Sequence, residues 1–407
     1  MLWQPSLHDR YSNASSEELA RDIAARRKEL GEKLVILGHH YQTDTVIRHA
    51  DLTGDSLKLS QLAARVADEQ PVEHIIFCGV HFMAETADLL APEHVTVSLP
   101  DLSAGCSMAD MAQIDDCEDA WDAMHDSLER SGFRGRVIPI TYVNSSAAIK
   151  AFVGARGGAC CTSSNADTVF AWAAAGGTEP KADGEAIKIL FLPDQHLGRN
   201  TAHDFGVDVA TRAPLYDPKL ARRGQPLGGM TDEQLLDAEV ILWAGHCSVH
   251  KLFRPEHVDE LRAETPPEGS PPWTVIVHPE CDKAVVDKAD LSGSTEYILK
   301  TIDAAEPGTR WAVGTEHNLV NRLRQTAAER GVDVRILSDC QCLCTTMYRI
   351  DEPHLLWNLD MLCGISPSGK RREPEVPNRI RVADAHRADA VLSLDRMLSL
   401  SAAPAGA

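Results

Sequence analysis

The chain has 407 residues, and 40 Lys and Arg against 60 Asp and Glu give it a formal net charge of −20. This balance argues against a protein that works on nucleic acid or on an anionic membrane surface, because both require basic patches. A content of 43% hydrophobic and 25% charged residues is typical of a globular chain, and the length allows two or three domains. A small anionic ligand stays compatible, since a pocket can be locally positive inside an acidic protein.

The sequence also bears on the compartment in which the protein works. No apolar run reaches the ~20 residues of a membrane helix, and MLWQPSLHDRYSNASSEEL lacks the basic start and apolar centre of a secretory signal. We therefore expect a cytoplasmic protein. In a reducing cytosol the eleven cysteines are not expected to form a disulfide framework, so each is a candidate for packing or for metal ligation.

Alternating helices and strands are expected along the whole chain. The first helix should begin after Ser15 or Ser16, and another after Asp55 or Ser56, because these residue types cap helices. Short runs rich in Val, Ile and Leu predict strands, and such continuously apolar strands indicate parallel sheets with helices on both faces. The runs lie at 33–40, 74–80, 95–100, 136–144, 187–194, 240–246, 274–280, 310–316 and 332–339.

Two stretches interrupt this alternation. Residues 201–235 are less periodic and carry Pro, Gly and paired Arg, so we expect an excursion from the core there. Pro and Gly crowd 264–272, which indicates a linker or a surface loop.

Nearly every predicted strand ends in reactive or polar residues. The carboxyl ends of parallel strands form the ligand-binding rim of a sheet. One polar strand end is ordinary turn chemistry, but so many His, Cys, Tyr, Asn and Glu side chains in this position favour one composite active site. The ends read GHHYQ, CGVHFMAE, PDLSAGC, TYVNSS, CTSSN, LPDQHLG, WAGHC, HPEC, GTEH and SDCQC.

The cysteines divide by position. Cys106 follows Gly105 at the start of a predicted helix, and Cys247 ends a strand three residues before His250. A third group follows another strand as Cys340, Cys342 and Cys344, and no CxxC pair exists, so a zinc ribbon is disfavoured. A lone cysteine is usually a packing residue. Three strand-end thiols, one from each third of the chain, nevertheless suit an iron–sulfur cluster or zinc with one open coordination site.

The remaining cysteines are interpreted as packing residues. An extended doublet points its two side chains in opposite directions, so Cys160 and Cys161 cannot readily ligate one metal. The others have no supporting neighbours; they are Cys78, Cys117, Cys281 and Cys363.

Other motifs offer anion binding and proton transfer. GDSLKL (54–59) and SGSTEYI (292–298) place Gly and hydroxyls at predicted helix starts, where backbone N–H groups receive carboxylate or phosphate; an ordinary helix cap is the alternative. The acid–base candidates are His39, His40 and Tyr41 at one strand end and His278 with Glu280 at another.

Taken together, these motifs resemble the quinolinate synthase family from about residue 33 to about residue 398. Members of this family have three α/β/α domains in a pseudo-threefold arrangement around a central active site. Each domain supplies one cysteine to a [4Fe–4S] cluster whose fourth iron is open. The motifs that carry the resemblance are GHHYQ, ADLTGDSLKLSQLAA, CGVHFMAETADLLAP, AGCSMADM, YVNSSAAIKA, CTSSNA, FLPDQHLGRN, WAGHCSVH, HPEC, GTEHNLV and CLCTTMYRIDEPHLLWNL.

The resemblance implies domains at 1–125, joined by 351–407, at 126–255 with the excursion 201–235, and at 256–350. It implies the cluster ligands Cys106, Cys247 and Cys344, one from each domain. The family's C-x-x-M spacing selects Cys344 before Met347, and Cys342 is the alternative. Whether Cys340 and Cys342 form a regulatory redox pair stays open.

The resemblance also implies a reaction, the condensation of iminosuccinate with dihydroxyacetone phosphate to quinolinate in de novo NAD biosynthesis. An L-aspartate-oxidising enzyme would supply the iminosuccinate. Proton transfer would fall to Glu280, His278, His39 and Tyr41, with Glu280 as the main general base. The alternatives are a zinc hydrolase of a small anion and a non-catalytic iron–sulfur sensor. The implied substrate-binding residues are His39, Ser56, Tyr142, Asn144, Ser163, His250, His278, Glu280, Ser294 and Thr295.

Overall fold

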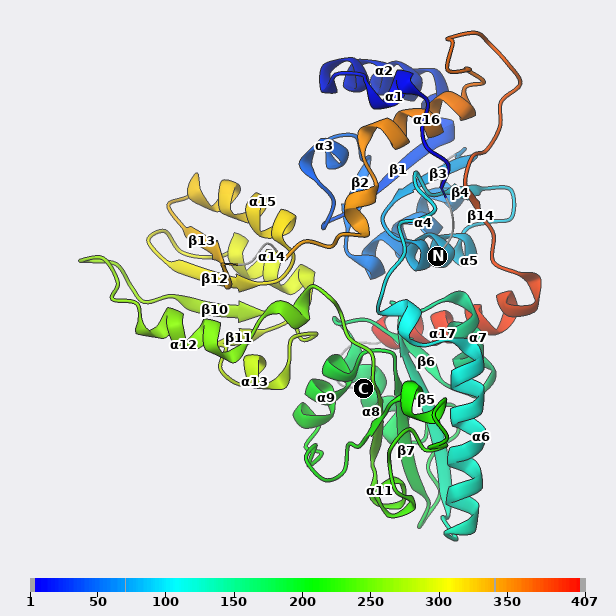
Figure 1. Ribbon diagram of the computed structural model, residues 1–407, viewed down its shortest axis with the longest axis vertical. Helices are drawn as coiled ribbons and strands as arrows, with labels where there is room; N and C mark the ends of the chain where they lie inside the picture. The colour runs from blue at the N-terminus through cyan, green and yellow to red at the C-terminus, as the bar shows by residue number, and fades with distance from the viewer. Residues whose placement is uncertain (1–3, 70, 340–341, 403–407) are drawn as a thin grey trace. The chain divides into compact units, whose positions relative to one another are not determined.

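The computed structural model describes residues 4–69, 71–339 and 342–402; Cys340 lies outside them. The chain is an α/β protein whose strands form three sheets (Figure 1). It divides into two compact units. The first comprises the residues up to Cys106 with His317–Leu319 and Leu343–Ala383, and the second comprises Ser107–Glu316, Val320–Cys342 and the chain from Asp384. The expected α/β class with mainly parallel sheets is confirmed.

The sheet of the first unit has the strand order β14-β4-β3-β1-β2. Its pairs are parallel except for β14, which runs antiparallel to β4. The central strand β1 is buried along its whole length, as expected for a strand covered on both faces. The strands are β1 (Leu34–His39), β2 (Leu52–Gly54), β3 (His74–Cys78), β4 (Thr96–Ser98) and β14 (Arg379–Ile380).

The helices of this unit begin at the caps that the sequence indicates. Ser15 and Glu18 form a reciprocal capping box at the start of α2, and Asp55, not Ser56, accepts the N–H of Lys58 at the start of α4. The helices are α1 (Asp9–Ser12), α2 (Ser16–Leu30), α3 (Asp44–Ile47), α4 (Ser56–Glu69), α5 (His81–Leu90) and α16 (Glu352–Leu362), with the 3₁₀ turns η1 (Gly31–Lys33) and η4 (Met347–Arg349).

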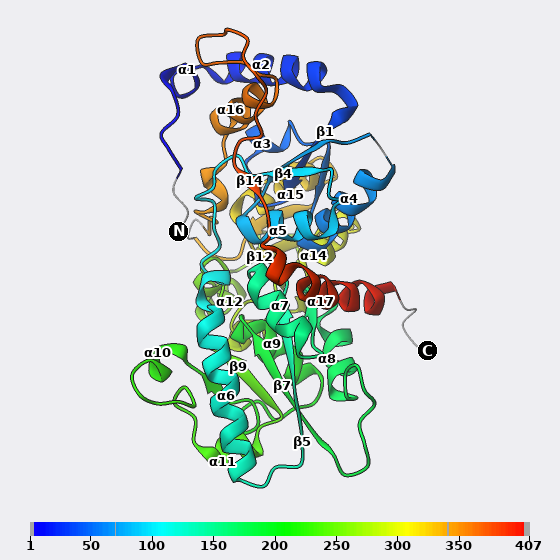
Figure 2. The same ribbon diagram turned by 90° about the vertical axis from the view of Figure 1, so that its right-hand side faces the viewer.

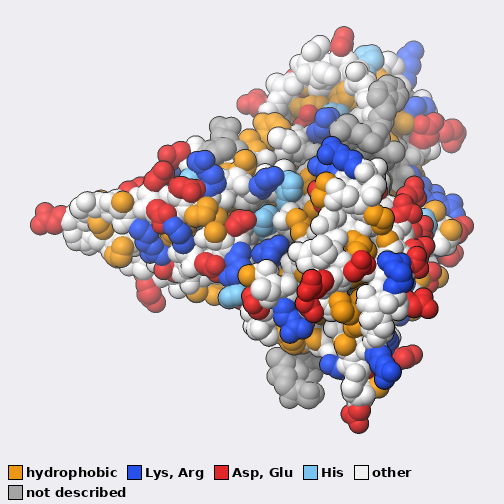
Figure 3. Space-filling model, turned by 60° about the horizontal axis from the view of Figure 1, so that its bottom comes forward, with side chains coloured by type: hydrophobic (Ala, Val, Ile, Leu, Met, Phe, Trp, Pro, Cys, Tyr) orange, Lys and Arg blue, Asp and Glu red, His pale blue; other side chains and the backbone are white. Residues whose placement is uncertain are grey.

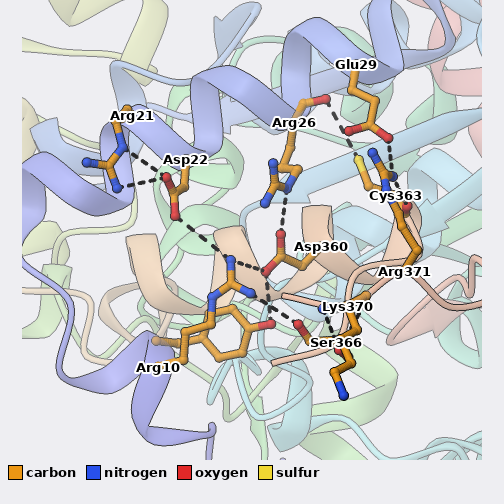
Figure 4. Close-up of polar contacts among 11 residues, drawn as sticks. Arg10, Arg21, Asp22, Arg26, Glu29, Asp360, Cys363, Ser366, Lys370 and Arg371 are labelled. Carbon is orange, nitrogen blue, oxygen red and sulfur yellow. Dashed lines mark hydrogen bonds and ion pairs between the residues drawn. The ribbon is translucent and has the colours of Figure 1, made fainter. Parts of the chain in front are cut away.

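One buried carboxylate joins α1 and α2 to α16 (Figure 4). Asp360 is fully buried and accepts hydrogen bonds from Tyr11 Oη at 3.1 Å and Arg26 Nε at 2.7 Å. Arg10 Nη2 lies 3.1 Å from the same carboxylate. Because charge and hydrogen-bonding capacity are matched, this buried acid is tolerated inside the unit.

The second unit contains two sheets in which the strands run parallel. Their orders are β6-β5-β7-β9-β8 and β11-β10-β12-β13. Parallel pairing brings the carboxyl ends of all strands of a sheet to the same edge. The strands are β5 (Gly135–Tyr142), β6 (Ala159–Cys161), β7 (Ala186–Leu192), β8 (Leu215–Tyr216), β9 (Val240–Trp243), β10 (Thr274–Val277), β11 (Leu291–Ser292), β12 (Arg310–Gly314) and β13 (Asp333–Ile336).

Helices pack closely on the first of these two sheets. In α6, Cys117, Ala120, Met124 and Leu128 form one buried face at helical spacing and join its core. The helices and 3₁₀ turns of the unit are η2 (Ala109–Met111), α6 (Ile114–Arg130), α7 (Ala147–Ala155), α8 (Ala166–Ala174), α9 (Gln195–Asp204), α10 (Pro218–Ala221), α11 (Asp232–Asp237), η3 (His250–Leu252), α12 (Pro255–Ala263), α13 (Lys283–Val286), α14 (Thr295–Asp303), α15 (His317–Ala328) from Val320 on, and α17 (Asp384–Ala402).

The C-terminal segment is shared between the units. Helix α16 and strand β14 belong to the first unit, whereas α17 packs against α7 in the second (Figure 2). A Cβ at Gly154 of α7 would lie 1.8 Å from the carbonyl oxygen of Asp389, so the missing side chain allows this close approach. The domain boundaries expected at 125, 255 and 350 stay a prediction.

Residues 201–235 contribute to the sheet. They supply the edge strand β8, and Tyr216 stacks on Trp243 of the neighbouring strand with ring centroids 5.1 Å apart. Every apolar run expected to be a strand is one. The strands that were not expected are the short ones at sheet edges, β2, β6, β8, β11 and β14, which are only two or three residues long.

The surface agrees with the acidic composition. On the face drawn in Figure 3, acidic and basic side chains are interspersed and form no single large basic patch. Among the described residues, no helix is long and apolar enough to cross a membrane.

Asp360→Ala should destabilise the first unit, because it leaves Arg10 and Arg26 without their buried counter-charge. Breaking a buried ion pair from one side costs roughly 3–5 kcal/mol. We expect a lower midpoint of urea unfolding and faster hydrogen exchange in α1 and α2. Glu73→Ala is the control, since Glu73 pairs with Lys33 at the surface of the same unit and does not contact the Asp360 group; it should lower the midpoint far less. Equal losses would contradict the role given to Asp360.

Candidate active site

Four of the predicted site residues meet inside the second unit. Tyr142 is the last residue of β5, His250 follows the loop after β9, and His278 with Glu280 forms the turn after β10. Their side chains are at most 5% exposed. Residues from strand ends of two sheets therefore converge, as the pattern of polar strand ends predicts for this unit.

Glu280 contacts two other residues of this group. Tyr142 Oη donates a hydrogen bond to Glu280 Oε1 at 2.6 Å, and His250 Nδ1 lies 2.9 Å from Oε2. The rings of His250 and His278 stack with centroids 4.4 Å apart. The backbone N–H of Glu280 donates to His278 Nδ1 at 3.3 Å, so a neutral His278 carries its proton on Nε2.

The surroundings set the charges of these residues. Burial alone would raise the pKa of Glu280, but His250 and His278, with the hydrogen bonds from His250 and Tyr142, outweigh it and hold that pKa below its ordinary value. Burial, followed by the neighbouring His250, lowers the pKa of His278 to about 3. Near neutral pH the site therefore holds an ionised carboxylate beside a neutral imidazole.

A buried threonine completes the environment of His250. Thr315 Oγ1 lies 3.2 Å from His250 Nε2. When His250 donates its Nδ1 proton to Glu280, Nε2 is an acceptor for the Thr315 hydroxyl. This pair of contacts fixes both the tautomer and the plane of the ring.

Cys247 brings a metal donor to the same place. One ligand atom each of Cys247, His250 and Glu280 lie within 4.8 Å of one another. The backbone N–H of Cys247 donates to Asp194 Oδ2 at 3.2 Å. Thiolate, imidazole and carboxylate are all metal ligands, so this part of the site has donors that suit a metal.

Exposure separates the predicted cluster ligands from the other cysteines. Cys106, Cys247 and Cys344 are half-buried, whereas every other described cysteine is buried, and none of those described forms a disulfide. Cys342 is fully buried with its Sγ 3.3 Å from Ser338 Oγ. Cys106 and Cys344 belong to the first unit and Cys247 to the second. The three thiols selected from the sequence are thus the more exposed ones among the described cysteines.

Two predicted substrate-binding hydroxyls share a pocket in the second unit. Ser163 and Ser294 line a pocket of about 380 Å³. Ser294 caps α14 and accepts the N–H of Tyr297, so it lies at a helix N-terminus. Thr295, the first residue of that helix, is buried. Asn144 Oδ1 is buried and has no hydrogen-bond partner in the described structure, which leaves one acceptor for a ligand.

The remaining predicted residues lie in the first unit. His39 is the buried last residue of β1, and its Nδ1 accepts the N–H of Tyr41 at 3.1 Å. Their rings contact edge to face at 4.7 Å, and Asn318 Nδ2 donates to the carbonyl oxygen of Tyr41 at 3.2 Å. Ser56 is the half-buried first residue of α4. His39 and Tyr41 are therefore brought together, as their spacing indicates.

Asp194 and Thr315 were not selected from the sequence. Asp194 is fully buried; burial, together with the charge of Glu280, raises its pKa. Both residues stand in strand-end motifs, LPDQHLG and GTEH, and this position is the signal by which they could have been selected. Asp194 alone resembles an ordinary helix cap, so its contact with Cys247 could not be read from the sequence.

Comparison with known proteins places the chain in a family. A family model described as "Quinolinate synthetase A protein" matches residues 21–399. A quinolinate synthase of Nocardioides sp. is 50% identical over 390 residues, which cover 95% of this chain and 90% of that protein. Quinolinate synthases of Herpetosiphon aurantiacus and Halalkalibacterium halodurans are 48% and 47% identical, each over 96% of this chain and over 95% and 96% of their own lengths.

The family model spans both units, and the relatives align along nearly their whole length. The strand-end motifs that build the site lie inside the matched residues. The chain belongs to the quinolinate synthase family.

Proposed function

We propose that the protein condenses iminosuccinate with dihydroxyacetone phosphate to give quinolinate, phosphate and two waters in de novo NAD biosynthesis. The observation that carries this proposal is the buried Glu280 held by Tyr142 and His250, within reach of Cys247. An L-aspartate-oxidising enzyme of the cytoplasm would supply the iminosuccinate. The reaction needs a base, acids for departing hydroxyls, and places for several negative charges.

Glu280 is proposed as the main general base. Its carboxylate is ionised near neutral pH, because its neighbours hold its pKa low. It contacts Tyr142 and His250, both of which carry exchangeable protons, so a substrate proton passes to Glu280 directly or through one of them. His278, neutral with its proton on Nε2, is suited to donate to a substrate oxygen. His39 and Tyr41 supply further groups for proton transfer from the first unit.

Neutral donors are proposed to hold the anionic substrates. Ser163 and Ser294 line one pocket, and Ser294, Thr295 and Ser56 stand at helix N-termini, where backbone N–H groups favour carboxylate or phosphate. Asn144 is assigned to the same role, because its side-chain amide carries two N–H donors. Such a site binds anions without a basic surface, in agreement with the net charge of −20.

Cys106, Cys247 and Cys344 are proposed to hold a [4Fe–4S] cluster with one open iron. Their fit rests on their being the half-buried cysteines among those described. When bound, the cluster supplies a Lewis acid that polarises a carbonyl or a departing hydroxyl. The contact of the Cys247 backbone with Asp194 orients this loop.

A second candidate function has one observation in its favour. The donor atoms of Cys247, His250 and Glu280 are close enough together to bind zinc, and zinc would fit a hydrolase of a small anion. Metal analysis of anaerobically purified protein separates the candidates: iron with acid-labile sulfide supports the synthase, and zinc without sulfide supports the hydrolase. An intact cluster without quinolinate formation would instead indicate an iron–sulfur sensor.

Glu280→Gln should keep the cluster and lose turnover by roughly 10²–10⁴-fold, because the amide cannot accept a proton. The measurement is quinolinate formation from dihydroxyacetone phosphate and iminosuccinate generated in place. Glu352→Gln is the matched control, since Glu352 is a buried glutamate 2.7 Å from His49 Nε2. It should retain near-normal turnover; a normal rate for Glu280→Gln would remove Glu280 from catalysis.

Serine at Cys106, Cys247 or Cys344 should in each case abolish the visible iron–sulfur absorption of anaerobic protein, because each removes a thiolate ligand. Cys342→Ser is the control: Cys342 is fully buried beside Ser338, and its variant should keep the cluster. The opposite result, with the cluster lost in Cys342→Ser and kept in Cys344→Ser, would show that Cys342 is the third ligand.

A further inference from the structure

The motif FLPDQHLGRN (191–200) runs from the end of β7 into helix α9, and apart from the contact of Asp194 with Cys247 neither the resemblance nor the proposed chemistry gives it a role. The helix begins after Asp194 and includes Gly198 and Asn200. It follows β7, so its first turn starts at the same sheet edge as Tyr142. Asn200 of this helix borders the pocket that Ser163 and Ser294 line and also contacts the turn that carries Glu280.

Asn200 contacts the backbone on both sides of Glu280. Its Nδ2 donates to the carbonyl oxygen of Pro279 at 2.9 Å and to that of Cys281 at 3.0 Å. The residue is 4% exposed. A planar amide has two N–H bonds in fixed directions, so these two carbonyls define the orientation of the turn that carries Glu280.

The other atom of the same amide indicates why asparagine is used. Asn200 Oδ1 is buried and has no hydrogen-bond partner in the described structure. A buried unsatisfied acceptor is destabilising, so an apolar residue would serve packing at least as well as asparagine. The reason for an asparagine at position 200 is therefore its two N–H donors.

The geometry of Glu280 is sensitive to the position of that turn. Its two carboxylate oxygens receive contacts of 2.6 Å from Tyr142 and 2.9 Å from His250. A displacement of about 1 Å lengthens both beyond good hydrogen-bond distance, and errors of this size can lower rates by roughly 10²-fold.

Helix α9 is itself held firmly. Asp194 Oδ1 accepts the N–H groups of His196 and Leu197 at 2.8 and 2.7 Å, and Oδ2 accepts that of Cys247. A Cβ at Gly198 would lie 2.7 Å from the Phe191 ring and 2.8 Å from Leu242, so glycine lets the helix lie close to β7 and β9. Asn200 thus projects from a rigid element.

We propose that Asn200 is a positioning residue that fixes the Glu280 carboxylate by clamping the two carbonyls that flank it. The proposal rests on the proposed function in taking Glu280 as the general base. Three residues of the motif then have a role. Asp194 and Gly198 hold helix α9 in place, and Asn200 fixes the turn that carries Glu280.

The first test is Asn200→Asp, which keeps the size of the side chain and removes both donors. We expect kcat for quinolinate formation to fall by roughly 10- to 100-fold and iron and sulfide content to stay unchanged. The kcat value decides, because the new carboxylate borders the pocket proposed for the anions and also weakens their binding. If Asn200 acts through Glu280, the double variant N200D/E280Q is no slower than E280Q alone. Multiplying rate losses would overturn the proposal.

Asn358→Asp is the matched control. Asn358 is also buried, its Nδ2 donates to the carbonyl oxygen of Pro100 at 3.4 Å, and its Oδ1 has no partner in the described structure. It lies in α16 of the first unit. It should leave kcat near the wild-type value; a loss equal to that of Asn200→Asp would mean that burying any new charge slows the enzyme, and would overturn the proposal.

Hydrogen exchange measured by mass spectrometry tests the clamp without activity. The N–H of Glu280 is bonded to His278 Nδ1 and that of Cys281 to the carbonyl oxygen of His278. Exchange of a peptide over 278–281 should accelerate in Asn200→Asp and not in Asn358→Asp, whereas unchanged exchange would overturn the proposal.

Asn200→Ala, without the added charge, replaces Asn200→Asp if that variant does not fold. Wild-type protein that forms no quinolinate would refute the proposed function, yet the exchange result would still decide whether Asn200 holds the turn.

Discussion

The second unit is built around the burial of one negative charge. A carboxylate enclosed by protein is tolerated only when donors surround it, and Glu280 receives them from Tyr142 and His250. These residues come from the ends of β5, β9 and β10, in two different sheets. The charge therefore constrains the lengths of three strands and the relative placement of two sheets. The groups that contact the carboxylate keep it ionised, and burial keeps its neighbour His278 neutral. The contacts that folding requires therefore also set the charges that proton transfer requires.

The acidic chain and the anionic substrates of the proposed reaction are reconciled by the kind of donor. Hydroxyls and backbone N–H groups at helix starts carry no net charge. They bind anions without Lys or Arg side chains, which would pair with the acidic side chains of the protein. Ser294 illustrates this: its hydroxyl caps α14 and borders the pocket that Ser163 also lines. A pocket of this type distinguishes anions by shape and by the number of donors more than by electrostatic attraction, which suits a reaction with two different anions.

The long apolar strands could be predicted because burial on both faces leaves a continuous hydrophobic signal. Short edge strands such as β8 leave no such signal, so residues 201–235 resembled an excursion although they extend the sheet. Strand-end position indicated Glu280 and His278 as site residues, whereas His250, the reaction and the full set of cluster ligands came from the resemblance. Asn200 could not be found, because its importance depends on which carbonyls its helix meets, and that is fixed only by tertiary packing.

The choice between Cys342 and Cys344 as the third cluster ligand also depends on tertiary packing and not on spacing alone. Residues two apart share a face only in an extended strand, and β13 ends at Ile336, before either cysteine. Spacing alone therefore leaves both thiols possible. Burial separates them: Cys342 points into the core beside Ser338, whereas Cys344 is half-buried beside Thr346. A thiol in the core is costly to ionise, and a metal ligand must be a thiolate. Exposure therefore favours the residue that the family spacing selects, Cys344, and the ligand assignment stays a prediction.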